Sequence, residues 1–371
     1  MKICYNMEEG SMKKTTAILS LLLLSLLLLS LSLLTGCGGQ AKPNNGSEPP
    51  KTIKIGYIAM TGGSPQALIN REKKLFEKAF GESGYEVEWV ITRGRDNVGP
   101  LMEEGKFHFL YTPINNFTAY FTETSQFAAG DNYRIIAGSQ AVEEGSILLV
   151  NENISELKDL DGKVIGIVNN SYSHEMLLNL QLAKAGLSTE TVGGTVKIKF
   201  QDYLAEFYEM FRNGEFDAII ARSKEEQKLS ERFPNAKKLL AINDGNAAGE
   251  LIPSVWLYAR TDVLENWPDL VNIMLETHIE ATAAAEENRA ELPRLAADTL
   301  DYYYKEIVGA VEYEQTPMEE IVSQWSGLHI TYDPNEDFVK KLHTFIFDAG
   351  YTDKPYNEFA DFRPLKAILE K

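Results

Sequence analysis

The sequence predicts an α/β protein built of two lobes that are joined by two crossing segments and followed by a helical C-terminal tail. The first observation is that short apolar runs alternate with segments of helical periodicity from residue 53 onwards. The second is that this alternation occurs in two blocks, one ending near residue 150 and the other beginning near residue 157. Strands that alternate with helices favour a mostly parallel sheet in each block.

The first block opens with the apolar strand 53–58, and Pro65 then suits the first turn of a helix that continues to Phe80. Tyr85, Val87 and Trp89 alternate with polar residues and indicate the next strand. We then expect a helix that ends near residue 105, a strand at 107–111, a helix that opens at 112–116, and strands at 134–138 and 146–150.

The second block begins with a turn at 159–162 and the apolar run 164–168. A polar loop at 171–174 precedes a helix over 176–187, in which apolar residues recur at helical spacing and Gly186 takes the usual C-terminal position. Further strands are expected at 196–200, 216–221, 238–242 and 255–258. Pro268 lies in the first turn of a long helix that begins the tail.

The amino terminus reads as a lipoprotein signal peptide, residues 1–36. Lys13 and Lys14 precede a run of Leu and Ser at 17–34, and the sequence Leu-Thr-Gly-Cys at 34–37 resembles the bacterial lipobox. That resemblance implies lipidation of Cys37 and anchoring at the extracytoplasmic face of a Gram-positive cell membrane. A retained transmembrane anchor is the alternative, and Met12 competes with Met1 as the start. Residues 37–52 form the lipidated end and a flexible tether.

Charge and cysteine content exclude several function classes. Removing residues 1–36, which carry three Lys and two Glu, takes the net charge from −18 to −19, so no nucleic-acid partner is expected. The two cysteines are Cys4, which leaves with the signal peptide, and Cys37. Disulfides, thiolate catalysis and cysteine-ligated metals are therefore excluded, and no cofactor is expected.

We assign lobe I to residues 53–150 plus 247–371 and lobe II to residues 151–246, with hinges near 143–150 and 243–251. In such sheets ligands bind beyond the carboxyl ends of the strands. This rule brings the loops 61–65, 111–115 and 171–174 to one cleft, together with Arg222. The candidate ligand-binding residues are Thr61, Gly62, Ser64, Gln66, Tyr111, Thr112, Asn115, Ser171, Tyr172, Ser173, His174 and Arg222.

These candidates suit a small oxyanion, because helix-start amides at 61–66 and 171–174 and one guanidinium can hold its charge. Each has a plainer interpretation: Ser171 as an N-cap, Arg222 as a surface residue paired with Glu225 or Glu226, and the tyrosines as core. The second ligand hypothesis is a flat neutral heterocycle held between aromatic rings, with Tyr111, Tyr172 and Trp256 as the candidates.

The order of the segments resembles the extracytoplasmic substrate-binding proteins of ABC importers, in the NMT1/SsuA-like branch for nitrate, taurine and alkanesulfonates. The matching passages include IKIGY, EKKLFEKAFGESGYEVEW, SELKDLDGKVIGI with the following Ser-Tyr-Ser-His, NGEFDAIIA and WPDLVNIMLETHIEA. The resemblance implies a type II periplasmic-binding-protein fold that closes by a hinge, with a membrane permease and an ATPase as partners. It departs at Arg222, where many members place an aromatic residue.

We expect a monomeric binding protein that captures a sulfonate, taurine or nitrate, and not an enzyme. The rival is a metal-free enzyme on the same fold. Pyrimidine-synthesising relatives use Cys and His at a metal site, whereas the five histidines here (108, 174, 278, 329 and 343) form no close pair at ligand spacing. A Ser-His-Asp triad is not excluded by sequence, although no serine has the glycines of a nucleophile elbow.

Overall fold

The computed structural model describes residues 48–60, 62–93, 95–122, 132–143, 145–168, 171–201, 203–242, 251–310 and 312–371, with backbone only at 95–97 and 224. The signal peptide, residues 37–47 of the tether with Cys37, Thr61 and most of the second expected hinge lie outside these ranges. Within them, no helix is both long enough and apolar enough to cross a bilayer. All described residues belong to one compact unit, Ser47–Lys371.

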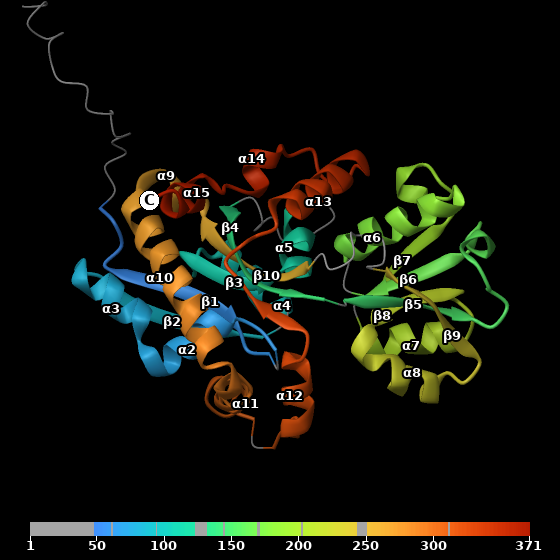
Figure 1. Ribbon diagram of the computed structural model, residues 1–371, viewed down its shortest axis with the longest axis horizontal. Coiled ribbons are helices and arrows are strands. Elements are labelled where there is room, and N and C mark those ends of the chain that lie inside the picture. Colours follow the sequence, from blue (N-terminus) through green and yellow to red (C-terminus); the bar gives the residue numbers. More distant parts are fainter. Residues whose placement is uncertain are drawn as a thin grey trace, which may run out of the picture. The chain divides into compact units, whose positions relative to one another are not determined.

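A six-stranded sheet contains the first strands of the chain, in the order β11-β4-β10-β3-β1-β2 (Figure 1). The strand β1 is parallel to β2 and β3, whereas β10 is antiparallel to β3 and β4, and β11 is antiparallel to β4. The bounds are β1 Thr52–Ile58, β2 Glu86–Thr92, β3 Phe109–Pro113, β4 Tyr133–Val142, β10 Ile252–Arg260 and β11 Leu328–Ile330.

The helix expected from Pro65 to Phe80 is two helices, α2 (Pro65–Lys73) and α3 (Leu75–Glu82). Lys74 separates them in the left-handed conformation with φ 54°, which no α-helix can continue through. The long helix α10 (Pro268–Glu287) buries Leu270, Val271 and Met274 in one core with β1, α2 and α3. The helices α4 (Arg95–Glu103) and α5 (Ile114–Phe121) complete this block.

A five-stranded sheet, on the right of Figure 1, has the order β7-β6-β8-β5-β9. Here β6 is parallel to β7 and β8, and β5 is antiparallel to β8 and β9. The bounds are β5 Ser146–Asn151, β6 Val164–Val168, β7 Lys197–Gln201, β8 Ala218–Arg222 and β9 Ala236–Ala241, with helices α6 Tyr172–Leu182, α7 Leu204–Arg212 and α8 Glu226–Arg232.

The expectation of mostly parallel sheets was wrong, because both sheets are mixed. The chain passes from β4 in the first sheet directly to β5 in the second, and it returns from β9 to β10. Of these four strands, β10 is antiparallel to β3 and β5 is antiparallel to β8, while β4 pairs with β10 and β9 pairs with β5. Consequently the amino ends of β5 and β10 reach the same sheet edges as the carboxyl ends of β3 and β8.

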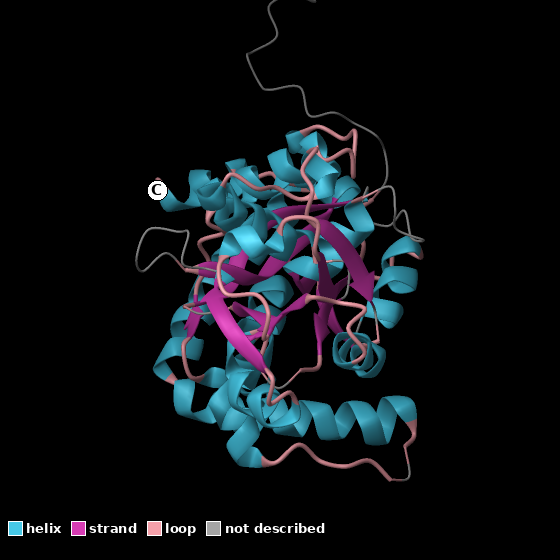
Figure 2. Cartoon of the chain, turned by 90° about the vertical axis from the view of Figure 1, so that its right-hand side faces the viewer, coloured by secondary structure: helices cyan, strands magenta, loops and turns pink. Residues whose placement is uncertain are grey.

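The C-terminal tail is helical, as expected, except for the short strand β11, which sequence periodicity did not indicate. Its elements are α9 Thr261–Asn266, α11 Leu292–Tyr302, a π-helical turn Tyr303–Val308, α12 Met318–Trp325, α13 Glu336–Asp348, α14 Tyr356–Phe359 and α15 Arg363–Leu369. Helix α13 shares a hydrophobic core with α5 and α6. Figure 2 shows helices around strands that occupy the interior.

Candidate ligand-binding cavity

A cavity of about 270 Å³ lies where strand ends of both sheets meet. Its polar side chains come from the ends of β4 and β8, the start of β5, the first turns of α5 and α6, and from β10 and α12. They are Asn115, Gln140, Ser146, Ser173, His174, Arg222, Ser254 and Gln324. The rest of the lining is apolar or glycine: Met60, Gly62, Pro113, Ile114, Val142, Gly145, Leu177, Ile252, Pro253, Val255 and Leu328.

His174 presents a neutral imidazole at this site. Its Nε2 lies 2.8 Å from the hydroxyl oxygen of Ser146, and its Nδ1 is buried without a hydrogen-bond partner in the described part of the chain. Burial, followed by the positive charge of Arg222, lowers the pKa of His174 to about 4. At neutral pH the ring can donate one hydrogen bond, but it carries no charge.

Ser173 and Asn115 connect the two sheets across the cavity. The Ser173 hydroxyl donates to Oδ1 of Asn115 over 2.8 Å, and Asn115 belongs to the first turn of α5, directly after β3. On the six-stranded side, Gln140 donates from Nε2 to the carbonyl of Gly62 over 3.2 Å. These bonds hold the loop after β1, the start of α5 and the start of α6 around one space.

Arg222 is the last residue of β8, and its side chain is exposed at the cavity. It makes neither an ion pair nor a side-chain hydrogen bond with any described residue. The two acids expected to pair with it are engaged elsewhere. Glu225 accepts a hydrogen bond from the Tyr208 hydroxyl at 3.0 Å, and Glu226 pairs with Lys238 at 3.1 Å. Neither acid pairs with the guanidinium of Arg222, which lines the cavity.

The charge among the described lining residues of this cavity is positive. Arg222 is its cation, and no Asp or Glu is found among the described lining residues. The first N–H groups of α6 have no acceptor within the helix, and the Ser171 side chain supplies no capping bond. The N–H groups of His174 and Glu175 bond to the carbonyl of Ser171. A guanidinium, the positive end of a helix and hydroxyls beside an apolar wall can hold an anionic head that carries an apolar group.

Four of the predicted site residues lie away from the cavity. The Gln66 amide is buried and donates to Thr282 Oγ1 at 3.0 Å while accepting from Ser139 at 2.7 Å. Tyr111 is buried, with its hydroxyl 2.9 Å from Nδ1 of His278. The remaining two, Thr112 and Tyr172, are buried at 0% and 1% exposure. Strand alternation turns Tyr111 towards α10, and Tyr172 packs on Tyr351 with ring centroids 4.4 Å apart.

The aromatic sandwich expected for a heterocycle is absent from the described lining. Trp256, the third candidate, is fully buried and donates from its indole to the carbonyl of Pro334 at 3.1 Å. Because Tyr111 and Tyr172 are also in the core, no aromatic ring is among the described residues around the cavity. The described lining therefore gives no support for a flat heterocycle as the ligand.

Of the other candidates, Gly62, Asn115, Ser173, His174 and Arg222 line the cavity, whereas Ser64 and Ser171 are buried beside it without lining it. Thr61 lies outside the described residues. The predicted loop 171–174 is shorter than expected, because α6 begins at Tyr172. Sequence reasoning missed the lining residues of the crossing strands: Gln140, Val142, Ser146, Ile252, Pro253, Ser254 and Val255.

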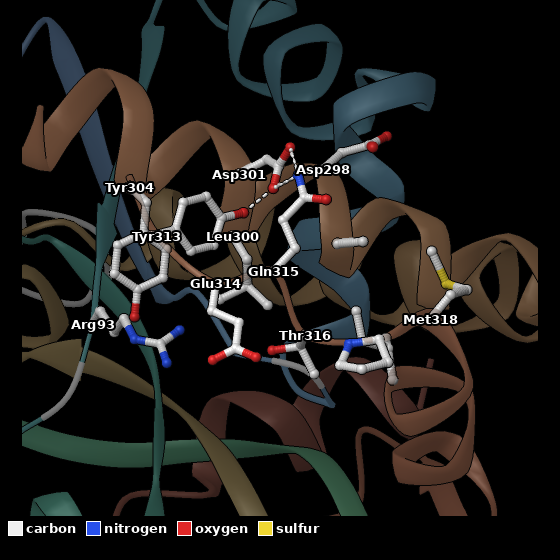
Figure 3. A pocket seen from close by; sticks show the side chains of 13 residues that line it. Arg93, Asp298, Leu300, Asp301, Tyr304, Tyr313, Glu314, Gln315, Thr316 and Met318 are labelled. Atoms are coloured by element: carbon white, nitrogen blue, oxygen red, sulfur yellow. Dashed lines mark hydrogen bonds between the residues drawn. The ribbon is translucent and has the colours of Figure 1, made fainter. Parts of the chain in front are cut away.

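A larger cavity of about 450 Å³ lies between α11, the π-helical turn and α12 (Figure 3). Its polar groups are largely satisfied by one another. Asp301 accepts from Gln315 at 2.9 Å and from Tyr313, and the Arg93 guanidinium lies 4.8 Å from the centre of the Tyr304 ring. The smaller cavity is the candidate ligand site, because it is lined by a cation, Arg222, that has no partner among the described residues, and by the start of α6.

Comparisons with known proteins agree with this architecture. The chain is 30% identical over 298 residues to a protein of Bacillus subtilis (strain 168) described as a candidate aliphatic sulfonates-binding protein, over 78% of this chain and 82% of that protein. The structure of the periplasmic aliphatic sulphonate binding protein SsuA from Escherichia coli matches with a TM-score of 0.57 and 20% identity, over 84% of this chain and 92% of that one.

A periplasmic sulfonate-binding protein of a candidate sulfonate ABC transporter from Methylobacillus flagellatus KT matches with a TM-score of 0.56 and 16% identity, over 87% and 95% of the two chains. The class is therefore that of α/β proteins with the two-lobed periplasmic-binding-protein fold. The profile of the NMT1/THI5-like family matches residues 80–291. The chain belongs to this family.

Proposed function

We propose that the chain is the extracytoplasmic substrate-binding component of an ABC importer and that it binds a small aliphatic sulfonate. The observation that carries the proposal is Arg222, which pairs with no described residue and lines a cavity whose other described residues are uncharged and largely apolar. The descriptions of the Bacillus subtilis and Escherichia coli proteins, which name aliphatic sulfonates, support the same class of ligand.

The sulfonate head is bound by Arg222 and by the first turn of α6. A guanidinium offers two parallel N–H donors to an oxyanion, and each charged hydrogen bond contributes about 1.5–3 kcal/mol. The helix terminus adds roughly 0.3–1 kcal/mol. The hydrogen-bonded pair of neutral His174 and Ser146 supplies one uncharged donor, either Nδ1 or the hydroxyl, so that no second positive charge is needed.

The apolar lining favours an alkanesulfonate over the other anions of this family. Nitrate has no apolar part to bury against Leu177, Ile252 and Val255. Taurine carries an ammonium group, and burying it in a cavity with no carboxylate among its described lining residues is costly. An aliphatic chain gains about 0.8 kcal/mol for each CH₂ that leaves water.

Two sheets joined by two crossings support the two lobes that we propose, residues 53–150 with 247–371 and residues 151–246. The five-stranded sheet also includes β5, Ser146–Asn151, which favours a first boundary nearer residue 145 than residue 150. The crossings between β4 and β5 and between β9 and β10 are the proposed hinges, at 143–150 and 243–251. Hinge closure would bring Arg222 and α6 towards Asn115 and Gln140 around the bound sulfonate. A smaller radius of gyration with ligand than without it supports closure, and an unchanged radius contradicts it.

The proposed role requires no chemical step at the cavity. Ser146 and His174 have the spacing of a nucleophile and its base. However, the lowered pKa of His174 makes it a weak base at neutral pH, and no described carboxylate orients its Nδ1. Binding and release to a permease, driven by a cytoplasmic ATPase, are therefore the functions that we assign to this monomer.

We further propose that Cys37 carries a lipid anchor at the extracytoplasmic face of a Gram-positive membrane. The lipobox-like sequence at 34–37 and the Gly/Pro/Asn/Ser-rich stretch after it support this. Two acyl chains suffice for stable anchoring. The Cys37→Ala variant should appear in the soluble fraction; if it is processed and still sediments with the membrane, the anchor assignment is wrong.

Calorimetric titration of the protein from residue 48 to its end with butanesulfonate, hexanesulfonate, taurine, nitrate and uracil tests the proposed function. We expect the two alkanesulfonates to bind more tightly than taurine by at least tenfold, and uracil not to bind. A ligand present at one hundred times its Kd raises the unfolding free energy by about 2.7 kcal/mol, which thermal unfolding detects independently. Binding of uracil alone would overturn the proposal.

A further inference from the structure

One side of the first turn of α6 lines the cavity, and the other side is buried in the protein. Ser173, His174 and Leu177 line the cavity, whereas Glu175, next in sequence to His174, points into the protein and is 0% exposed. A carboxyl group with no contact to solvent must be hydrogen-bonded to avoid a large loss of free energy. Its partners therefore fix the orientation of the turn that presents Ser173 and His174.

Glu175 accepts hydrogen bonds from three hydroxyl groups. Tyr351 donates to Oε2 at 2.8 Å, while Thr189 donates to Oε1 at 3.1 Å and Thr191 donates to the same oxygen. Burial raises the pKa of Glu175, and its hydrogen bonds to Thr191, Tyr351 and Thr189 oppose that rise. Thr189 and Thr191 lie 14 and 16 residues after Glu175, whereas Tyr351 lies 176 residues after it. Among these three donors, Tyr351 alone comes from a distant part of the chain.

Tyr351 belongs to the segment between α13 and α14, which is attached to the six-stranded sheet. Within this segment Lys354 donates to the carbonyl of Phe121 in α5 at 3.4 Å, and the adjoining Ala360 bridges to Ile135 in β4. The bond from Tyr351 to Glu175 therefore joins the C-terminal tail on one sheet to the helix that follows β6 in the other.

We propose that Glu175 and Tyr351 are positioning residues for ligand binding, which hold the first turn of α6 so that Ser173 and His174 face the bound anion. This inference rests on the proposed function. A helix start is held only weakly by its own hydrogen bonds, and Ser171 provides no side-chain cap. Besides the buried ring of Tyr172, side-chain hydrogen bonds orient this turn: Ser173 with Asn115, His174 with Ser146, and Glu175 with Tyr351, Thr189 and Thr191.

The test compares two tyrosine variants of the same segment. Tyr351→Phe removes one hydroxyl and keeps the ring that stacks on Tyr172. Tyr356→Phe is the matched control, because its hydroxyl is buried without a hydrogen-bond partner among the described residues. We expect the Kd for hexanesulfonate to rise about tenfold in Tyr351→Phe and to stay within twofold of wild type in Tyr356→Phe.

A local readout separates positioning from general stability. Amide hydrogen exchange at 172–177 should become at least tenfold faster in Tyr351→Phe, with exchange in β6 unchanged. The Glu175→Gln variant keeps one acceptor oxygen for three hydroxyl donors, so the Kd for hexanesulfonate should rise at least threefold with faster exchange at 172–177. This variant replaces the first comparison if Tyr351→Phe does not fold. Equal affinity and equal local exchange in Tyr351→Phe, or in Glu175→Gln where it takes its place, overturn the inference.

Failure of the proposed function gives a different result. If wild type binds none of the sulfonates, the functional assignment is wrong, while the exchange measurement at 172–177 still reports whether Tyr351 holds α6. If wild type binds hexanesulfonate and Tyr351→Phe binds it equally well, with unchanged exchange, the function stands and the positioning role is rejected.

Discussion

Ser146 and His174 lie 2.8 Å apart, from the hydroxyl oxygen of one to Nε2 of the other, and this contact joins the first residue of β5 to the first turn of α6. The strand β5 begins directly after the first crossing between the sheets. A hydrogen bond at this position ties the cavity wall to the segment proposed as a hinge. The pair thus links the bound ligand to the part of the chain that would move.

Sulfonate affinity should be nearly independent of pH between pH 6 and pH 8.5. Sulfonates stay ionised in this range, and His174, with its pKa lowered to about 4, stays neutral. The added attraction of a protonated ring should appear only below about pH 5. Titrations of wild type and of His329→Gln, which lacks an exposed histidine on β11, should superimpose. Affinity that increases from pH 7.5 to pH 6 would mean that His174 titrates normally.

Acid should destabilise the fold through His278. Its Nε2 donates to the carbonyl of Gly138 at 2.7 Å and its Nδ1 accepts from Tyr111, and burial lowers its pKa to about 4. Because the unfolded state binds a proton near pH 6.5 and the folded state does not, stability is lost as pH falls from 6.5 to 4. The loss by pH 5 is about 2 kcal/mol.

Urea unfolding of wild type and His278→Gln at pH 7.5 and pH 5 measures this contribution. The variant should lose about 2 kcal/mol less than wild type over that interval, even if it is less stable at both values. The same loss in both proteins would show that His278 is not the group responsible.

Gly138→Ala should destabilise the protein by about 2 kcal/mol or more. A Cβ at this residue of β4 would lie 2.1 Å from the carbonyl oxygen of Asp333, which is backbone and cannot rotate away. Gly81→Ala is the control, because a Cβ there meets nothing within 4 Å and alanine favours a helix. Thermal unfolding should place the two variants on opposite sides of wild type, and equal midpoints would contradict the close approach.

The residues after parallel strands could be predicted from sequence because one rule places them. Asn115 follows β3, Ser173 and His174 follow β6, and Arg222 ends β8. The carboxyl ends of parallel strands share one edge of a sheet. Ser146 and Ser254 could not be found in this way, since they are near the amino ends of antiparallel crossing strands. The pairing of a strand depends on residues that are distant in the sequence. Hydrophobic periodicity therefore does not predict which strands pair.

The sequence also did not predict whether a tyrosine ring points into the cavity or into the core. Tyr111 and Tyr172 belong to the loops predicted to line the cleft. Both rings are nevertheless buried, that of Tyr111 against His278 and that of Tyr172 against Tyr351. An aromatic ring suits a ligand site and a core equally well. Only the position of α10 and of the C-terminal tail, both more than 100 residues later in the chain, distinguishes the two.

The most direct test of the central claim is the affinity of Arg222→Ala for hexanesulfonate, measured by calorimetry beside Arg294→Ala. Arg294 is a surface residue of α11, paired with Asp298 at 2.8 Å, and its loss should leave the Kd within twofold of wild type. Loss of the charged hydrogen bonds of Arg222 should raise the Kd by about 10- to 100-fold, which corresponds to roughly 1.4–2.8 kcal/mol. An unchanged Kd in Arg222→Ala would contradict the account.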